Sequence, residues 1–117
     1  MTLLPQGVKV HLAFGYTDMR KGIDGLAMLV QDMLRQDPFS GHLFVFRGRK
    51  ASLLKIVFWD GTGLCLYTKR LEQGIFVWPS TVEPGGTLML SAQQMSLLID
   101  GVDWRAPVQQ WRPAAAG

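Results

Sequence analysis

The feature that most constrains the fold of this chain is a succession of three strand-like runs between residues 42 and 70. The runs are "HLFVFR", "LLKIVFW" and "LCLYTKR", rich in the β-branched and aromatic residues that favour strands. The links between them, "GRKAS" and "DGTG", have the length and composition of hairpin turns. The sequence therefore predicts an antiparallel β-meander.

The second hairpin also predicts which side chains share a face of the sheet. If Trp59 pairs with Leu64, Lys55 lies opposite Thr68, and side chains alternate between the two faces. One face then holds Leu53, Lys55, Val57, Trp59, Leu64, Leu66, Thr68 and Arg70, and the other holds Leu54, Ile56, Phe58, Cys65, Tyr67 and Lys69. Both faces are largely apolar, so we expect a helix to cover one side and partial cover on the other. The first hairpin leaves the face of Phe44 and Phe46 open.

A first helix is expected over about 22–35, because apolar residues recur there at spacings of three, four and seven. Thr17 or Asp18 precedes it as a plausible N-cap. Its apolar stripe, which we expect to be buried against the sheet, consists of Ile23, Leu26, Ala27, Val30, Met33 and Leu34. Cations near the expected helix ends, Arg20, Lys21 and Arg105, are expected to form ion pairs with Asp18, Asp24 or Asp103.

A second helix is expected after Ser91, which stands three residues before Gln94 in the spacing of a capping box. One face of this helix holds Met95, Leu98 and Ile99, and Gly101 ends it.

The remaining apolar runs predict further strands at 8–15, at 74–78 (ended by a proline) and at 87–91. This order of elements predicts the α+β class, with an antiparallel β-meander packed against two helices in a single domain. We expect that domain to span residues 1–111 and residues 112–117 to form a disordered C-terminal tail.

Composition favours a soluble cytoplasmic protein without a membrane partner. The N-terminus has no charged leader before its apolar run, and no run approaches the roughly 18 apolar residues of a membrane span. Cys65 is the single cysteine and cannot form an intramolecular disulfide, which favours a reducing compartment.

The sequence contains no recognisable catalytic motif, so we expect no enzymatic activity, no cofactor and no metal. His11 and His42 lie in expected strands at no metal-ligand spacing. A metal-dependent nuclease is a remote alternative, because it would require several carboxylates to converge on a hard cation. The acids considered for it are Asp18, Asp24, Asp60, Asp100 and Asp103.

Positive charge is concentrated in the meander. The net charge is only +3, but six cations and one acid between residues 42 and 70 give this segment +5 and leave −2 for the rest. The six cations, which are the candidate nucleic-acid-binding residues, are Arg47, Arg49, Lys50, Lys55, Lys69 and Arg70. Cations neutralise phosphates and neighbouring aromatic rings can stack on exposed bases. The alternative is that these cations only protect exposed strand edges.

The first turn of the meander, "FRGRK", is expected to form the tip of this basic surface. In an up-and-down meander, this turn and the end of the third strand fall at the same edge of the sheet. We expect Arg47, Arg49 and Lys50 to be exposed and without carboxylate partners, and Gly48 to adopt a positive φ that brings backbone amides toward a phosphate.

Four stretches together resemble the small accessory proteins, often called TnpB, of IS-sixty-six type bacterial insertion sequences. They are, in this order, "DMRKGIDGLAMLV", "DPFSGHLFVFRGR", "KIVFWDGTGLCLYTKRLEQGIFVWP" and "GVDWR". The resemblance runs from about residue 8 to residue 106. The resemblance implies a role in transposition beside a much larger catalytic transposase, and it supplies no functional residues.

The leading hypothesis is a non-enzymatic transposition accessory protein that binds DNA at the element ends through the basic hairpin and acts with the transposase. The alternative is an adaptor whose sheet face and "FVWP" segment dock the transposase without contacting DNA. The oligomeric state stays open.

Overall fold

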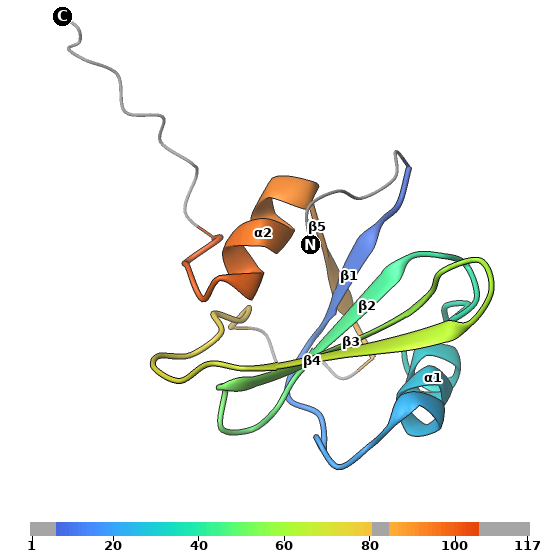
Figure 1. Ribbon diagram of the computed structural model, residues 1–117, viewed down its shortest axis with the longest axis horizontal. Helices are drawn as coiled ribbons and strands as arrows, with labels where there is room; N and C mark the ends of the chain where they lie inside the picture. Colours follow the sequence, from blue (N-terminus) through green and yellow to red (C-terminus); the bar gives the residue numbers. More distant parts are fainter. Residues whose placement is uncertain (1–6, 81–84, 106–117) are drawn as a thin grey trace, which may run out of the picture.

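The computed structural model describes residues 7–80 and 85–105 (Figure 1). Within these residues the chain forms a mixed sheet with the strand order β4-β3-β2-β1-β5 and two helices. The elements in chain order are β1 (Val10–Ala13), α1 (Ile23–Asp32), β2 (Leu43–Arg47), β3 (Leu53–Trp59), β4 (Leu64–Arg70), β5 (Thr87–Leu90) and α2 (Ala92–Ile99). The predicted α+β class is confirmed. The predicted tail at 112–117 lies outside the described residues, and the domain bounds stay a prediction.

The predicted meander is formed by β2, β3 and β4, which pair in antiparallel order. Trp59 pairs with Leu64, and Lys55 with Thr68, as predicted. Phe44 pairs with Val57, which settles the register that the sequence left open. β1 pairs in parallel with β2 and antiparallel with β5, so the sheet is mixed. The parallel pair follows from the connection between β1 and β2, which crosses over through α1.

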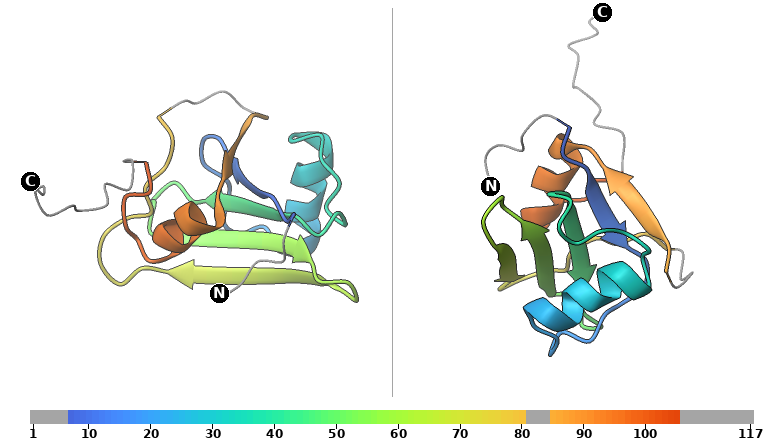
Figure 2. Two further views of the ribbon diagram at one scale, coloured as in Figure 1. Left: turned by 90° about the horizontal axis from the view of Figure 1, so that it is seen from above. Right: turned by 90° about the vertical axis from the view of Figure 1, so that its right-hand side faces the viewer.

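The two helices lie on opposite sides of the sheet (Figure 2). α1 covers the face that holds Phe44, Phe46 and Val57, with Leu64 and Leu66 at its edge. α2 covers the other face, where its buried side chains Met95, Leu98 and Ile99 join Leu54 and Ile56 of β3. Side chains that alternate along the strands of the meander are therefore buried on both faces of the sheet, as the apolar character of both faces indicated.

The start and stripe of α1 differ from the prediction. The N-cap is Gly22, which makes no side-chain cap, and not Thr17 or Asp18. The residues of the stripe that are buried are Leu26, Ala27, Val30 and Leu34. Ile23 is 36% exposed and Met33 is 46% exposed, because the helix is only ten residues long and these two stand at its ends.

The second helix agrees with the prediction. Ser91 accepts a hydrogen bond from the backbone N–H of Gln94, and the Gln94 side chain accepts one from the Ser91 backbone N–H, which completes the capping box. Gly101 follows the helix with φ at 75°, a conformation that favours glycine. The strand predicted at 87–91 is also confirmed, as β5.

The strand predicted at 74–78 is absent; this segment crosses the end of the sheet as an irregular chain. Phe76 and Trp78 are buried, which accounts for the strand-like alternation of the sequence. The backbone N–H of Phe76 donates to the carbonyl of Ala51 at 2.8 Å, so the backbone of the segment is bonded to the β2–β3 turn.

In the described part of the chain, neither helix has the length and apolar character that crossing a bilayer requires.

Candidate nucleic-acid interface

The β2–β3 turn, residues 48–52, is held in place by segments far away in the sequence. Thr17 donates its backbone N–H to the carbonyl of Arg47 at 2.9 Å, and Leu71 donates to that of Ser52 at 2.8 Å. The bond from Phe76 to Ala51 adds a third attachment. The turn backbone is therefore fixed without any contribution from the side chains of its own two outermost residues, Arg49 and Lys50.

Gly48 serves a different purpose from the predicted one. The positive φ of this turn belongs to Ala51, at 65°, and Gly48 is not among the described residues with positive φ. A Cβ on Gly48 would lie 2.5 Å from Cγ of Met19. Glycine therefore leaves room for the Met19 side chain of the β1–α1 connection, which a larger residue would force to shift.

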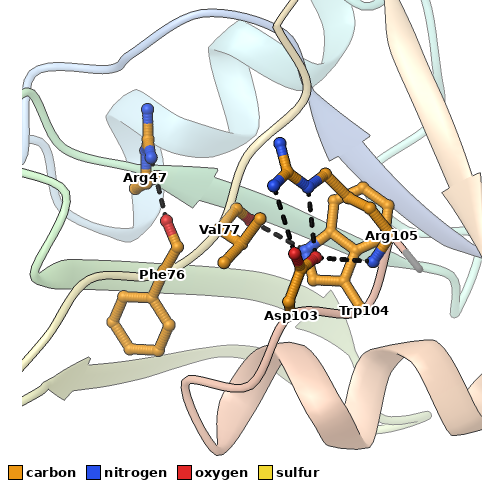
Figure 3. A network of polar contacts seen from close by, with 6 residues as sticks. All are labelled: Arg47, Phe76, Val77, Asp103, Trp104 and Arg105. Carbon is orange, nitrogen blue, oxygen red and sulfur yellow. Dashed lines mark hydrogen bonds and ion pairs between the residues drawn. The ribbon is translucent and has the colours of Figure 1, made fainter.

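Arg47 is not the exposed cation that the sequence predicted, although among the described residues it has no carboxylate partner. One terminal nitrogen, Nη1, donates to the carbonyl oxygen of Phe76 at 2.8 Å (Figure 3). The guanidinium carbon lies 5.2 Å from the centre of a Trp78 ring, and Nε is buried without a hydrogen-bond partner. Burial lowers the pKa of Arg47, although an arginine remains charged in proteins. Its main contacts are with the irregular segment that carries Phe76 and Trp78.

Two more of the six predicted cations bind backbone carbonyls. Lys55 Nζ donates to the carbonyl of Lys21 at 2.9 Å, just before α1. Lys69 Nζ donates to the carbonyl of Ile99 at 2.7 Å, at the C-terminal end of α2, where a cation interacts favourably with the helix dipole. Because side chains alternate along β4, Lys69 and Arg70 point to opposite faces of the sheet.

The other three predicted cations come together. Arg49, Lys50 and Arg70 are exposed and line one open cavity of about 530 Å³. The turn and the end of β4 lie at the same end of the sheet, opposite the β3–β4 turn (Figures 1 and 2). Arg70 has a weak exposed ion pair with Glu72 at 3.9 Å, and among the described residues Arg49 and Lys50 have no carboxylate within ion-pair distance.

Sequence reasoning missed two side chains at this cavity, Tyr16 and Arg20. The guanidinium of Arg49 lies 5.6 Å from the ring centre of Tyr16. Arg20 was predicted only as an ion-pair partner, and it does bind Asp18 through two nitrogens, at 3.0 and 2.8 Å. No local pattern could have placed these residues here, because their position depends on the connection from β1 to α1 lying against the β2–β3 turn.

Two of the predicted ion pairs are confirmed, Arg20 with Asp18 and Arg105 with Asp103. Hydrogen bonds from Arg20 hold the pKa of Asp18 well below its usual range. Hydrogen bonds from Arg105 lower the pKa of Asp103 in the same way. In the part of the chain that the structure describes, Lys21 forms no ion pair.

The "FVWP" segment contributes its two large aromatic side chains to the core. Phe76 and Trp78 are buried, and the indole N–H of Trp78 donates to the carbonyl of Ala13 at 2.8 Å. The indole N–H of Trp104 donates to the carbonyl of Val77 at 2.7 Å (Figure 3). These rings are therefore not exposed for docking a partner.

Asp60, one of the acids considered for a nuclease, and His11, considered as a metal ligand, both have structural contacts. Asp60 closes the β3–β4 turn by accepting hydrogen bonds from Thr62 and Gly63. His11 is buried and its ring stacks on those of Phe44 and His42; burial lowers its pKa. Across residues 7–80 and 85–105, no three His, Cys, Asp or Glu side chains are grouped closely enough to hold a metal ion.

Comparisons with known proteins give one family and two uncharacterized relatives. A family model described as IS66 Orf2 like protein matches residues 8–109. The uncharacterized protein y4hO of Sinorhizobium fredii (strain NGR234) is 51% identical over 117 residues, covering 98% of this chain and all of the relative. The uncharacterized protein y4jC of the same strain is 38% identical over 109 residues, covering 90% of this chain and 92% of the relative. No solved structure matches the chain.

Proposed function

This chain belongs to the IS66 Orf2-like family, the accessory proteins of IS66 insertion sequences, and we propose that it contributes to transposition by binding DNA. In this proposal the chain acts without catalysing a reaction itself, beside the separate transposase of the same element, in the cytoplasm. The DNA is bound by the cations around the cavity next to the β2–β3 turn. We call this set, which consists of Arg20, Arg49, Lys50 and Arg70, the cation rim.

The observation that carries the proposal is the charge of this cavity. Four cations line it, against one carboxylate, that of Asp18, which is already bound by Arg20. Like charges brought together on a surface repel one another and attract polyanions. DNA carries one phosphate charge per roughly 1.7 Å of helix axis, so it can neutralise several of these cations at once.

The six cations of the original hypothesis divide into two roles under this proposal. Arg49, Lys50 and Arg70 remain candidates for phosphate contact. Arg47 and Lys69 bind carbonyls of the protein itself, and we propose that they support the turn and α2. Lys55 also binds a carbonyl, that of Lys21, on the face of the sheet that carries Arg70. Burial of Phe76 and Trp78 removes two large rings from the surface that the adaptor hypothesis assigned to the sheet face and the "FVWP" segment.

A salt titration with two matched double variants tests the proposal. Arg49→Ala/Lys50→Ala removes two cations from the rim, and Lys9→Ala/Arg105→Ala removes two exposed cations that do not line the cavity. Binding to duplex DNA from the element ends is measured by fluorescence anisotropy over a salt series, with and without the transposase. We expect the first variant to flatten the slope of log K against log salt by about 2 units, since each lost contact contributes about 0.9. The control should keep the wild-type slope.

Equal slopes for the two variants would overturn the assignment to the rim. Wild-type protein that binds no DNA, with or without transposase, would overturn DNA binding altogether. Salt-insensitive binding to the transposase in that case would favour the adaptor hypothesis, because an apolar interface depends little on salt.

A further inference from the structure

The cavity beside the β2–β3 turn has features that phosphate binding does not require. It opens between the β1–α1 connection, residues 16–20, and the turn with the start of β3, residues 48–53, and Arg70 stands at its edge. Its volume of about 530 Å³ falls within the roughly 300–1,000 Å³ of small-ligand sites. A flat, charged surface would suffice to contact the outside of a duplex.

Tyr16 is the one aromatic side chain among the described residues that line this cavity. Its side chain is 62% exposed, while Arg49 lies over its ring at 5.6 Å between the guanidinium carbon and the ring centre. An arginine over an aromatic face is attracted to the ring and can also stack on a base. The ring and the guanidinium therefore stand together among the residues that line the cavity.

The inner surface of the cavity is partly apolar. Met19 and Leu53 line it beside the cations. An apolar lining with a few polar groups suits a ligand that has one flat apolar part and one anionic part. A nucleotide whose base has left the helical stack has this combination, whereas a paired base keeps its faces covered by its neighbours.

Both walls of the cavity are preformed. The backbone N–H of Thr17 donates to Arg47 at 2.9 Å, which joins the β1–α1 connection to the end of β2. Gly48 donates to Leu53 at 3.0 Å and closes the turn. A site that is already ordered loses little conformational entropy when a ligand binds.

We propose that this cavity binds an unpaired base of single-stranded DNA, with Tyr16 as the stacking surface and the cation rim on the adjoining phosphates. The proposal rests on the DNA-binding function proposed above, since it uses the same cations, and adds a preference for unpaired over duplex DNA. Single strands arise wherever a duplex end frays or a strand is displaced.

The test compares two single strands that carry equal charge but differ in their bases, with a duplex as the third probe. The probes are a 20-nucleotide oligothymidine, a 20-nucleotide strand in which abasic residues replace the thymidines, and a 20-base-pair duplex. For the wild-type protein we expect oligothymidine to bind at least about fivefold more tightly than the abasic strand, as follows from the stacking of one base on an aromatic ring. Tyr16→Leu should remove that difference and leave duplex affinity unchanged, while Tyr16→Phe should preserve it.

Two further variants separate this proposal from the broader one. Phe39→Leu removes another half-exposed aromatic ring, which packs edge-on against Trp59 at the opposite end of β3, and should change nothing. Arg49→Ala should weaken binding to every probe. Equal affinity of the wild type for oligothymidine and the abasic strand would overturn base binding and leave duplex binding standing. An equal loss on all probes in Tyr16→Leu would also overturn it, because the ring would then act only by supporting Arg49.

Discussion

The two turns of the meander differ in what holds them. The β3–β4 turn is closed by its own side chain, because Oδ1 of Asp60 accepts hydrogen bonds from the backbone N–H groups of Thr62 and Gly63 at 2.9 and 2.8 Å. The hydroxyl of Thr62 donates to the same oxygen at 3.1 Å. The polar side chains at the centre of this turn are therefore engaged in stabilising the turn itself.

The β2–β3 turn has the opposite organisation. Its backbone is attached to Thr17, Leu71 and Phe76, which belong to three separate segments. Arg49 and Lys50 at its tip make no hydrogen bond in the described structure and face a cavity. A turn that is stabilised by distant segments leaves its side chains free of structural contacts, which is what the proposed function requires of the β2–β3 turn.

The largest effect is expected from removing the ring of Trp78, which anchors the segment bonded to the β2–β3 turn. Trp78→Ala should lower the free energy of unfolding by about 3–5 kcal/mol, because it leaves a cavity in the core and leaves the carbonyl of Ala13 without its indole donor. Urea unfolding measures this loss. Trp78→Phe keeps most of the packing and should cost less than Trp78→Ala. Equal stability of the two variants would contradict the packing role.

A second substitution loosens the β2–β3 turn alone. Arg47→Met keeps the apolar stem but leaves the carbonyl of Phe76 without its charged donor, so we expect a loss of about 1–3 kcal/mol. Amide hydrogen exchange should speed up at Phe76 and stay unchanged at Gly63, in the other turn. A variant as stable as the wild type would show that Arg47 is the free cation that the sequence first predicted.

Local features of this fold could be predicted from the sequence. The pairing of Trp59 with Leu64 follows from the "DGTG" turn, and the capping box of α2 from Ser91 and Gln94. In both cases the interacting groups lie within a few residues of one another. A short pattern of residue types is therefore enough to predict such an interaction.

The roles of the cations could not be predicted in the same way. Arg47, Lys55 and Lys69 donate to carbonyls that lie 29, 34 and 30 residues away. Every residue has a carbonyl, so such an acceptor leaves no trace in the sequence. An ion pair such as Arg20 with Asp18 can be predicted, because both partners are recognisable residue types in the sequence. The strand predicted at 74–78 failed for a related reason, since alternate burial of side chains does not require a neighbouring strand.

A smaller effect is the pH dependence of the stability that Asp60 gives to the β3–β4 turn. Hydrogen bonds from the backbone of Thr62, and then of Gly63, lower the pKa of Asp60 from 3.8 to about 2. Because the folded pKa lies below the unfolded one, the carboxylate stabilises the fold above about pH 4, and this stabilisation is lost as pH falls through about 2. The Tm of Asp60→Asn should lie below that of the wild type at pH 6, and the difference should close toward pH 2. A difference that persists at pH 2 would contradict an effect of ionisation.

The smallest effect on stability is expected at the tip of the β2–β3 turn, where Arg49 and Lys50 have no structural role in this comparison. Arg49→Ala/Lys50→Ala should change the free energy of unfolding by less than about 0.5 kcal/mol, because surface substitutions away from structural contacts are close to neutral. The sign of the change in Tm shows whether Arg49 and Lys50 stabilise their turn. Four cations around one cavity repel one another, and the Debye length grows from about 10 Å at 0.1 M salt to about 30 Å at 0.01 M. The Tm of this variant should therefore rise slightly above the wild type at low salt and match it at high salt, whereas Arg47→Met should stay below at both. A lower Tm for the double variant would mean that Arg49 and Lys50 stabilise their turn after all, as Asp60 does, and the two turns would no longer differ.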